Sequence, residues 1–293
     1  MKASTTIAAS ASCMLLAATG LLASAGGSSD PYRVQLNATQ AGPGQLELTW
    51  AGGRPAYQLQ QLRALDEQWT NVGEPTTATS AIVAQDAAMG FFRVIDDYTA
   101  RYEVTLDATW SEATHPQDWP RPGHWSGLVG AVHNDQVEFY HVGKTASEGI
   151  RRMAEQGDQA TLLSEVAPAV ASGAAQFALR GSGVNPSPGS TRLPFPQPVR
   201  RDHSLVTLCS MVAPSPDWFV GVSGLDLIQD GQWRQSVTVD LYPHDAGTDS
   251  GVTFRSLDKV TVPRGVITPL QVYPIAVNGS VTPFGTFTFR RLD

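Results

Sequence analysis

Apolar and polar side chains alternate along most of the chain, in short runs that glycine and proline separate. The first runs place apolar residues at 34, 36 and 38 and at 46, 48 and 50, and Gly/Pro-rich turns divide them. Alternation with a period of two is typical of antiparallel strands that bury one face. The run "FFRV" at 91–94 ends this series. Residues 32–97 are therefore predicted to form a small β-sandwich.

A second series begins near Tyr98 and continues to the end of the chain. Every second residue from 102 to 110 is apolar, and Phe287 and Phe289 alternate with polar residues near the C-terminus. Residues 146–172 are rich in Ala, Glu and Leu and predict helical material, which Gly157 and Pro168 are expected to interrupt. Residues 181–198 are predicted to form a long loop, because their prolines disfavour a regular strand. The chain is thus predicted to be all-β, with two β-sandwich domains at 32–97 and 98–293 and a short helical insertion in the second.

The first 25 residues have the pattern of a secretory signal peptide. Lys2 precedes an apolar run that includes residues 14–18 and 21–22, and Ala23-Ser24-Ala25 provides small residues for cleavage. The apolar stretch is too short and too broken to span a bilayer, for which roughly 20 residues are needed. We expect residues 1–25 to be removed and residues 26–31 to form a connector. The predicted location is extracellular or at the cell surface, with the periplasm as the alternative in a Gram-negative cell.

Composition and charge narrow the classes of partner. The chain carries a formal net charge of -7 at pH 7 and contains two cysteines, Cys13 and Cys209. An acidic chain without a cluster of Lys or Arg argues against nucleic acid or an anionic membrane as partner, and it suits a cation. Removal of the leader would leave Cys209 alone, so no internal disulfide is expected. Cys209 ends the apolar run from Leu205 and is predicted to lie in the core.

Three aspartates are predicted to meet at one edge of the second sandwich. Residues 218–227 and 233–242 are both rich in strand formers, and Asp230-Gly231 between them is a strong hairpin turn. In a hairpin centred there, Asp217 and Asp245 lie at equal distances from the turn and face each other. Asp249 follows in a Gly/Thr turn that can fold back to the same place. Three adjacent carboxylates repel one another unless a cation neutralises them, and oxygen ligands suit Ca²⁺. The alternative is that these aspartates only initiate turns.

Several stretches together resemble the spondin domain. These are "APSPDWFVGVSGLDL" and "DLYPHDAGTDSG", preceded by "VTLDATWSEATHPQDWP", "HWSGLVGAVHN" and "ASEGIRRMAEQGD". The resemblance implies a C2-like antiparallel sandwich, a calcium site at one edge, and a role in matrix attachment or ligand recognition. By motif, the calcium ligands of that family fall on Asp217, Asp245 and Asp249. The first unit resembles immunoglobulin-like or fibronectin type III-like modules through "LTWAGGRPAYQLQ", "WTNVG" and "FFRV".

The sequence also departs from animal spondin proteins. It contains no thrombospondin-type repeats, no reeler module and no Arg-Gly-Asp tripeptide, so integrin or matrix partners do not follow from the resemblance. Position 228 is Ile where animal relatives tend to have cysteine. This difference leaves Cys209 without an evident disulfide partner, while calcium binding is unaffected.

Enzymatic alternatives lack their required residues. Gly221-Val222-Ser223-Gly224 does not have the spacing of a nucleophile elbow, and the histidines form no zinc motif. The acidic residues of the 146–172 segment are expected to be a solvated helix face rather than a glycosidase pair.

The aromatic residues Trp110, Trp119, His124 and Trp125 are candidates for a carbohydrate or peptide surface or, alternatively, for the core. We therefore predict a non-enzymatic calcium-dependent adhesion or ligand-recognition protein with an extracellular protein or glycan ligand. A structural spacer without a ligand is the alternative, and a carbohydrate-active hydrolase is a weaker one.

Overall fold

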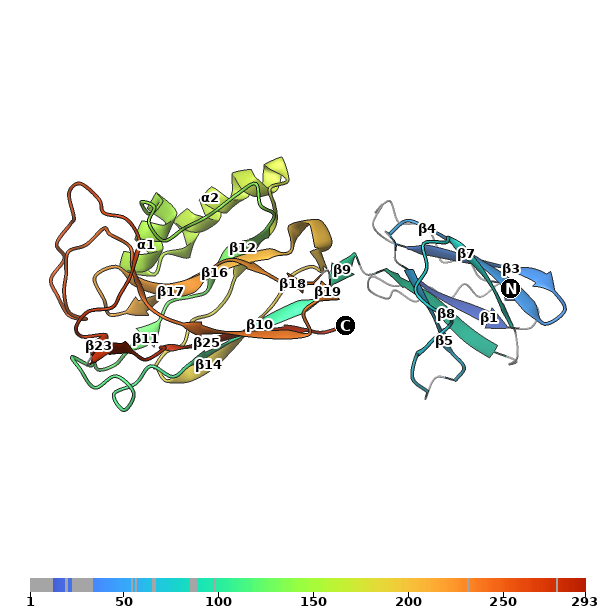
Figure 1. The fold of residues 1–293 in the computed structure, drawn as a ribbon, viewed down its shortest axis with the longest axis horizontal. Helices are drawn as coiled ribbons and strands as arrows, with labels where there is room; N and C mark the ends of the chain where they lie inside the picture. Colours follow the sequence, from blue (N-terminus) through green and yellow to red (C-terminus); the bar gives the residue numbers. More distant parts are fainter. Residues whose placement is uncertain are drawn as a thin grey trace, which may run out of the picture. The chain divides into compact units, whose positions relative to one another are not determined.

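The chain folds into two β-rich units. The computed structural model describes residues 13–18, 21–22, 34–53, 55, 57–64, 67–84, 89–96, 98–230, 232–277 and 279–293. One unit comprises Met1–Thr99 and the other Ala100–Asp293 (Figure 1). The predicted cleavage site and the 26–31 connector lie outside the described residues. Within the predicted leader, Cys13–Ala18 forms strand β1 and pairs with β8.

The first unit is a sandwich of two antiparallel sheets with the core between them. The strands are β1 (Cys13–Ala18), β2 (Leu21–Leu22), β3 (Gln35–Gly42), β4 (Gln45–Ala51), β5 (Tyr57–Leu62), β6 (Thr70–Asn71), β7 (Ser80–Ala84) and β8 (Met89–Asp96). One sheet has the order β2-β1-β8-β5-β6 and the other β3-β4-β7. Leu48 and Trp50 from one sheet meet Leu59 and Val94 from the other in a single apolar cluster. Along β4, buried and exposed residues alternate, as predicted.

The second unit is a larger antiparallel sandwich. Its four-stranded sheet has the order β14-β10-β25-β20, formed by Gly189–Pro194, Tyr102–Ala108, Gly285–Arg291 and Ser236–Leu241. The facing sheet has the order β13-β12-β16-β17-β21-β22, and β11 also pairs with β16. These strands are β11 (His124–Trp125), β12 (Val129–His133), β13 (Ala175–Arg180), β16 (Leu205–Ala213), β17 (Trp218–Asp226), β21 (His244–Asp245) and β22 (Thr268–Pro269). Short ladders join β9 (Thr99–Ala100) to β15 (Val199–Arg200), β18 (Ile228–Gln229) to β19 (Gln232–Trp233), and β23 (Ala276–Val277) to β24 (Ser280–Val281). A 3-10 turn covers Arg201–His203.

The core of the second unit is aromatic and aliphatic and lies between its two sheets. Leu106 and Phe287 from the smaller sheet and Leu208 and Val220 from the larger one belong to the same buried cluster. Trp110 and Trp125 are also buried in this cluster, and Trp119 packs against it. The interpretation as core residues is therefore confirmed for Trp110 and Trp125, while Trp119 and His124 are only partly buried.

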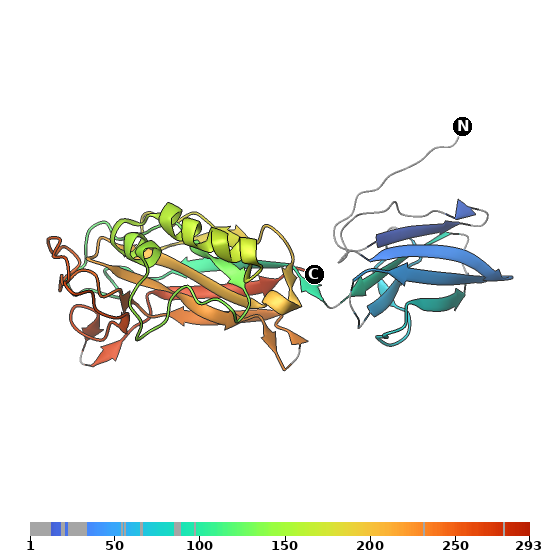
Figure 2. The same cartoon turned by 90° about the horizontal axis from the view of Figure 1, so that it is seen from above.

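Two helices cover the outer face of the larger sheet (Figure 2). Helix α1 (Glu148–Gln156) ends at Gly157, which adopts a left-handed conformation (φ 67°) that suits glycine. Helix α2 (Gln159–Ser172) follows at once. The prediction of helical material was right, but Pro168 does not interrupt it, because α2 continues to Ser172 with Pro168 inside. Residues of α1 and α2 pack on Cys209 and Phe219, so β16 is buried on both faces.

The prediction of a loop throughout residues 181–198 was wrong in one part. Residues 189–194 form strand β14, which pairs with β10 from Glu103 to Ala108. Strand β14 lies at the edge of its sheet and its only proline is its last residue. Proline is tolerated at an edge because one side of the strand needs no ladder hydrogen bonds.

The burial of Cys209 gives a direct test of this fold. Its thiol is fully buried, and burial raises its pKa to about 12. Thiolate is the reactive form, so the native protein should not react at neutral pH. In a Cys13→Ser variant, we expect Ellman's reagent to detect no thiol in buffer and one thiol after denaturation in guanidinium chloride. Rapid reaction of the native variant would contradict the placement of Cys209 under the helices.

Candidate metal centre

Strands β17 and β21 bring Asp217 and Asp245 together. Trp218 pairs with Asp245 and Phe219 with His244 in an antiparallel ladder. The main-chain N–H of Ala246 donates to the carbonyl oxygen of Asp217 at 3.2 Å. Asp217 thus immediately precedes β17, and Asp245 lies beside its first residue. The juxtaposition predicted from the sequence is present.

Asp217 and Asp245 are brought together by a strand pairing that differs from the predicted hairpin. Around the predicted turn, only the short strands β18 and β19 pair with each other. The predicted pairing of 218–227 with 233–242 is wrong, because β20 pairs with β25 in the other sheet. Strand β17 has β16 on one side and β21 on the other, which leaves no edge there for β20. After β20, the chain crosses back to the larger sheet, where β21 pairs with β17. This pairing places Asp245 next to Asp217.

The carboxylate of Asp217 is buried and only half satisfied. Its Oδ2 accepts hydrogen bonds from the N–H of Thr248 at 2.7 Å, the hydroxyl of Thr248 at 3.1 Å and the N–H of Asp249 at 3.0 Å. Its Oδ1 is buried and has no hydrogen-bond partner. Asp217 itself is fully buried. A buried carboxylate oxygen without a partner is costly and is a position where a bound ion would be stabilising.

Asp245 and Asp249 each shape a turn with one oxygen. Oδ1 of Asp245 accepts from the N–H of Gly247 at 2.7 Å, and Oδ1 of Asp249 accepts from the N–H of Gly251 at 2.7 Å. Oδ2 of Asp249 accepts from the N–H of Lys259 at 2.7 Å. The turn-forming role considered as the alternative is therefore present. It leaves Oδ2 of Asp245 and Oδ1 of Asp217 as the oxygens without a hydrogen bond to a described residue.

The three carboxylates influence one another electrostatically. Burial and, after it, the charge of Asp245 raise the pKa of Asp217 to about 6, against the hydrogen bonds from Thr248 and Asp249, which lower it. Burial also raises the pKa of Asp245, opposed by the hydrogen bond from Gly247 and reinforced by the charge of Asp249. In the part of the chain that the structure describes, none of the three forms an ion pair with Lys, Arg or His. Their ionised forms therefore lack a compensating positive charge.

The three predicted ligands do not make a complete metal site by themselves. Across the described ranges, no three His, Cys, Asp or Glu side chains come close enough together to hold a metal ion by themselves. Calcium commonly combines carboxylates with carbonyl oxygens and water in a shell of about 6 to 8 ligands. Asp217 Oδ1 with the carboxylates of Asp245 and Asp249 would supply its charged part.

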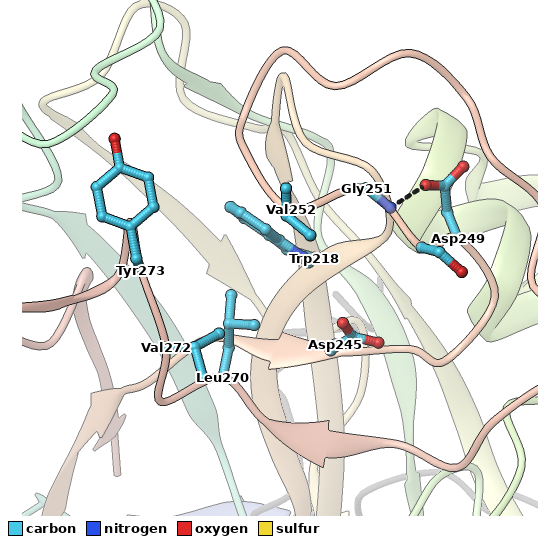
Figure 3. Close-up of a pocket in the computed structure, with 9 residues that line it drawn as sticks. Trp218, Asp245, Asp249, Gly251, Val252, Leu270, Val272 and Tyr273 are labelled. Atoms are coloured by element: carbon cyan, nitrogen blue, oxygen red, sulfur yellow. Dashed lines mark hydrogen bonds between the residues drawn. The ribbon is translucent and has the colours of Figure 1, made fainter.

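A cavity of about 420 Å³ adjoins these aspartates. Asp245 and Asp249 line one side of it, and Trp218 separates them from Tyr273 and Val272 on the other side (Figure 3). The remaining lining residues are Ser250, Gly251, Val252 and Leu270. No sequence pattern predicted the wall at residues 270–273, which lack alternation and lie far from Asp217 along the chain. Thr248 was also missed, although a hydroxyl beside predicted metal ligands is a usual orienting group.

Comparison with known proteins identifies relatives of the second unit. The family model described as Spondin_N matches residues 100–282. Spondin-2 of Rattus norvegicus is 36% identical over 196 residues, which are 66% of this chain and 58% of that protein. Spondin-2 of Homo sapiens is 37% identical over 174 residues, covering 58% of this chain and 52% of that protein. Spondin-1 of Gallus gallus is 39% identical over 181 residues, or 59% of this chain and 22% of that protein. The chain therefore spans about half of the spondin-2 proteins and about a fifth of Spondin-1.

The family model begins after the first unit, whose resemblance to immunoglobulin-like modules stays a prediction.

The raised pKa of Asp217 predicts a dependence of stability on pH in the metal-free protein. The folded state holds this proton more tightly than the unfolded chain, in which the pKa is near 3.8. Ionisation of Asp217 therefore destabilises the fold above pH about 6, and this cost disappears below pH about 4. In chelator, the free energy of unfolding of Asp217→Asn relative to wild type should increase by roughly 1–3 kcal/mol as the pH is raised through this window.

Denaturant titrations at several pH values measure this difference. Asp240→Asn is the matched control, because Asp240 is an exposed carboxylate on β20. It gives the baseline of the comparison. A difference between Asp217→Asn and wild type that does not change with pH would show that Asp217 is not a buried charge.

Proposed function

Because the chain belongs to the Spondin_N family, we propose that it is an extracellular, calcium-dependent ligand-recognition protein of the spondin type. The family model covers most of the second unit, from residue 100 to residue 282. Spondin-type proteins have an extracellular role, and the expected leader agrees with that location. Neither α1 nor α2 is both long and apolar enough to cross a membrane, within the residues that the structure describes.

One observation carries the calcium proposal. Asp217 is fully buried, its Oδ1 lacks any partner, and Asp245 and Asp249 add negative charge beside it. Neutralising this charge by protonation becomes unfavourable at neutral pH, whereas a divalent cation would compensate two of the carboxylates at once. The family resemblance supports the same three residues independently. We propose that Asp217, Asp245 and Asp249 bind one Ca²⁺ together with main-chain oxygens and water.

The function of the ion would be structural. It would fix the turn at 245–251 against the start of β17, and this turn forms part of the wall of the adjoining cavity. The bound ligand would be an extracellular protein or glycan, recognised at the end of the sandwich that the ion holds in shape. We propose no catalytic activity, since the two carboxylates that line the cavity, Asp245 and Asp249, are the proposed ligands of the ion.

Loss of one carboxylate should weaken calcium binding strongly. We expect Asp245→Ala to bind Ca²⁺ at least about tenfold more weakly than wild type by isothermal titration calorimetry, because a charged ligand is removed from a buried site. Asp240→Ala, which removes an exposed carboxylate from β20, should leave the affinity unchanged. Equal affinity of Asp245→Ala and wild type would refute the assignment.

Calcium should also stabilise the folded protein. At a hundredfold excess over the dissociation constant, binding adds about 2.7 kcal/mol. This gain raises the midpoint of thermal unfolding by about 5–10 °C for a domain of this size. A structural spacer without a metal site would unfold at the same temperature in calcium and in chelator.

A further inference from the structure

Exposed aliphatic side chains are concentrated in residues 252–273, which we name the apolar loops. Of the twelve large hydrophobic residues that are exposed in the described part of the chain, seven lie in this segment. Leu257 is 91% exposed, Val262 85%, Val260 74% and Val252 70%. Single exposed apolar residues are ordinary on a protein surface, but a contiguous group marks a surface that binds something.

These side chains are held outward by the fold of the loop. Phe254 is buried between Trp110 and Trp218, with ring centroids 5.1 and 5.0 Å away. The main-chain N–H of Phe254 donates to Asp118 at 2.9 Å. Phe254 is thus anchored in the core, while Leu257, three residues further along the chain, lies at the surface.

The base of the same loop is closed by hydrogen bonds. The N–H of Ser250 donates to the carbonyl of Lys259 at 2.8 Å, and the N–H of Thr261 donates to the carbonyl of Thr248 at 2.9 Å. Asp249 accepts from the main-chain N–H groups of Gly251 and Lys259, one on each side of the loop. The tip between these residues is thus presented on a rigid stem.

Positive charge accompanies the exposed aliphatic residues. Residues 252–273 contain Arg255, Lys259 and Arg264 and one acid, Asp258, which gives a local net charge of +2 in a chain of -7. Arg264 pairs with Glu148 at 3.0 Å. Arg255 and Lys259 flank Leu257, and within the described residues neither forms an ion pair with an acidic side chain. The overall acidic charge argued against an anionic membrane as partner, but residues 252–273 carry a net positive charge.

The apolar loops project from one end of the second unit. In Figures 1 and 2 the orange and red segments between β21 and β23 extend beyond the strand ends, away from the C-terminus. Leu257 and Val262 protrude almost completely. Protruding aliphatic side chains with adjacent Lys and Arg are suited to a lipid surface, where the aliphatic groups enter the acyl boundary and the cations contact phosphates. Tyr273, 57% exposed on the same loops, is a residue type that favours the membrane interface.

We propose that the apolar loops dock the protein onto the surface of a phospholipid bilayer. Leu257 and Val262 insert shallowly, and Arg255 and Lys259 contact lipid phosphates. This inference goes beyond the proposed function, because it assigns a second contact that would hold the protein at a membrane while its ligand is bound. It does not require the calcium site, since the exposure and the charges belong to the protein alone.

Vesicle cosedimentation tests the proposal with the protein as it is exported. The probes are vesicles of phosphatidylcholine and vesicles of equal parts phosphatidylcholine and phosphatidylglycerol, each in calcium and in chelator. We expect wild type to bind the mixed vesicles and Leu257→Ser/Val262→Ser to bind them at least about tenfold more weakly. Arg255→Gln/Lys259→Gln should lose the preference for the mixed vesicles, by about fivefold for each cation removed.

Ile82→Ser/Leu292→Ser is the matched control. It removes two exposed aliphatic residues, 64% and 46% exposed, that lie outside the apolar loops. It should bind like wild type.

Equal binding by Leu257→Ser/Val262→Ser and wild type, or no binding to any vesicle by folded protein, would overturn the proposal. So would a wild-type dimer in size-exclusion chromatography that Leu257→Ser/Val262→Ser converts to a monomer, since the loops would then bind a second copy. Calorimetry on the same variants keeps the two proposals apart, because loop variants should retain wild-type calcium affinity.

Discussion

The end of the second sandwich depends on the buried carboxylate of Asp217. It accepts three hydrogen bonds from Thr248 and Asp249, and these bonds attach the turn after β21 to the start of β17. The attachment buries a charge and leaves one oxygen without a partner. Such an arrangement is costly unless a positive charge compensates it. Bound calcium would compensate the charge of the Asp217 carboxylate, and the same carboxylate would then stabilise the attachment of the turn to β17.

Further structure is built on this attachment. Asp249 closes the loop that follows, and Phe254 of that loop fills the space between Trp110 and Trp218 in the core. Asp245, Asp249, most residues that line the cavity and the apolar loops therefore all belong to one segment, residues 245–273, which Asp217 contacts through Thr248 and Asp249.

Much of this architecture could be predicted from the sequence. Strands β4, β10 and β25 follow from the alternation of apolar residues, and both helices follow from their composition. Strand β14 was missed because an edge strand tolerates a proline-rich context that a central strand would not. The partner of β20 was predicted wrongly because a two-residue turn determines only the residues nearest to it. Which sheet a strand joins is decided by long-range packing, and here β21 and β16 already occupy both edges of β17.

The proximity of Asp217 and Asp245 was predicted correctly through a wrong pairing, so this agreement does not itself support the metal site. The most direct test is a crystal structure of the protein grown in millimolar Ca²⁺. We predict an anomalous density peak bonded to Asp217 Oδ1 and to oxygens of Asp245 and Asp249, at about 2.3–2.6 Å. A map without such a peak, in which Asp217 Oδ1 contacts only water or is protonated, would contradict the account.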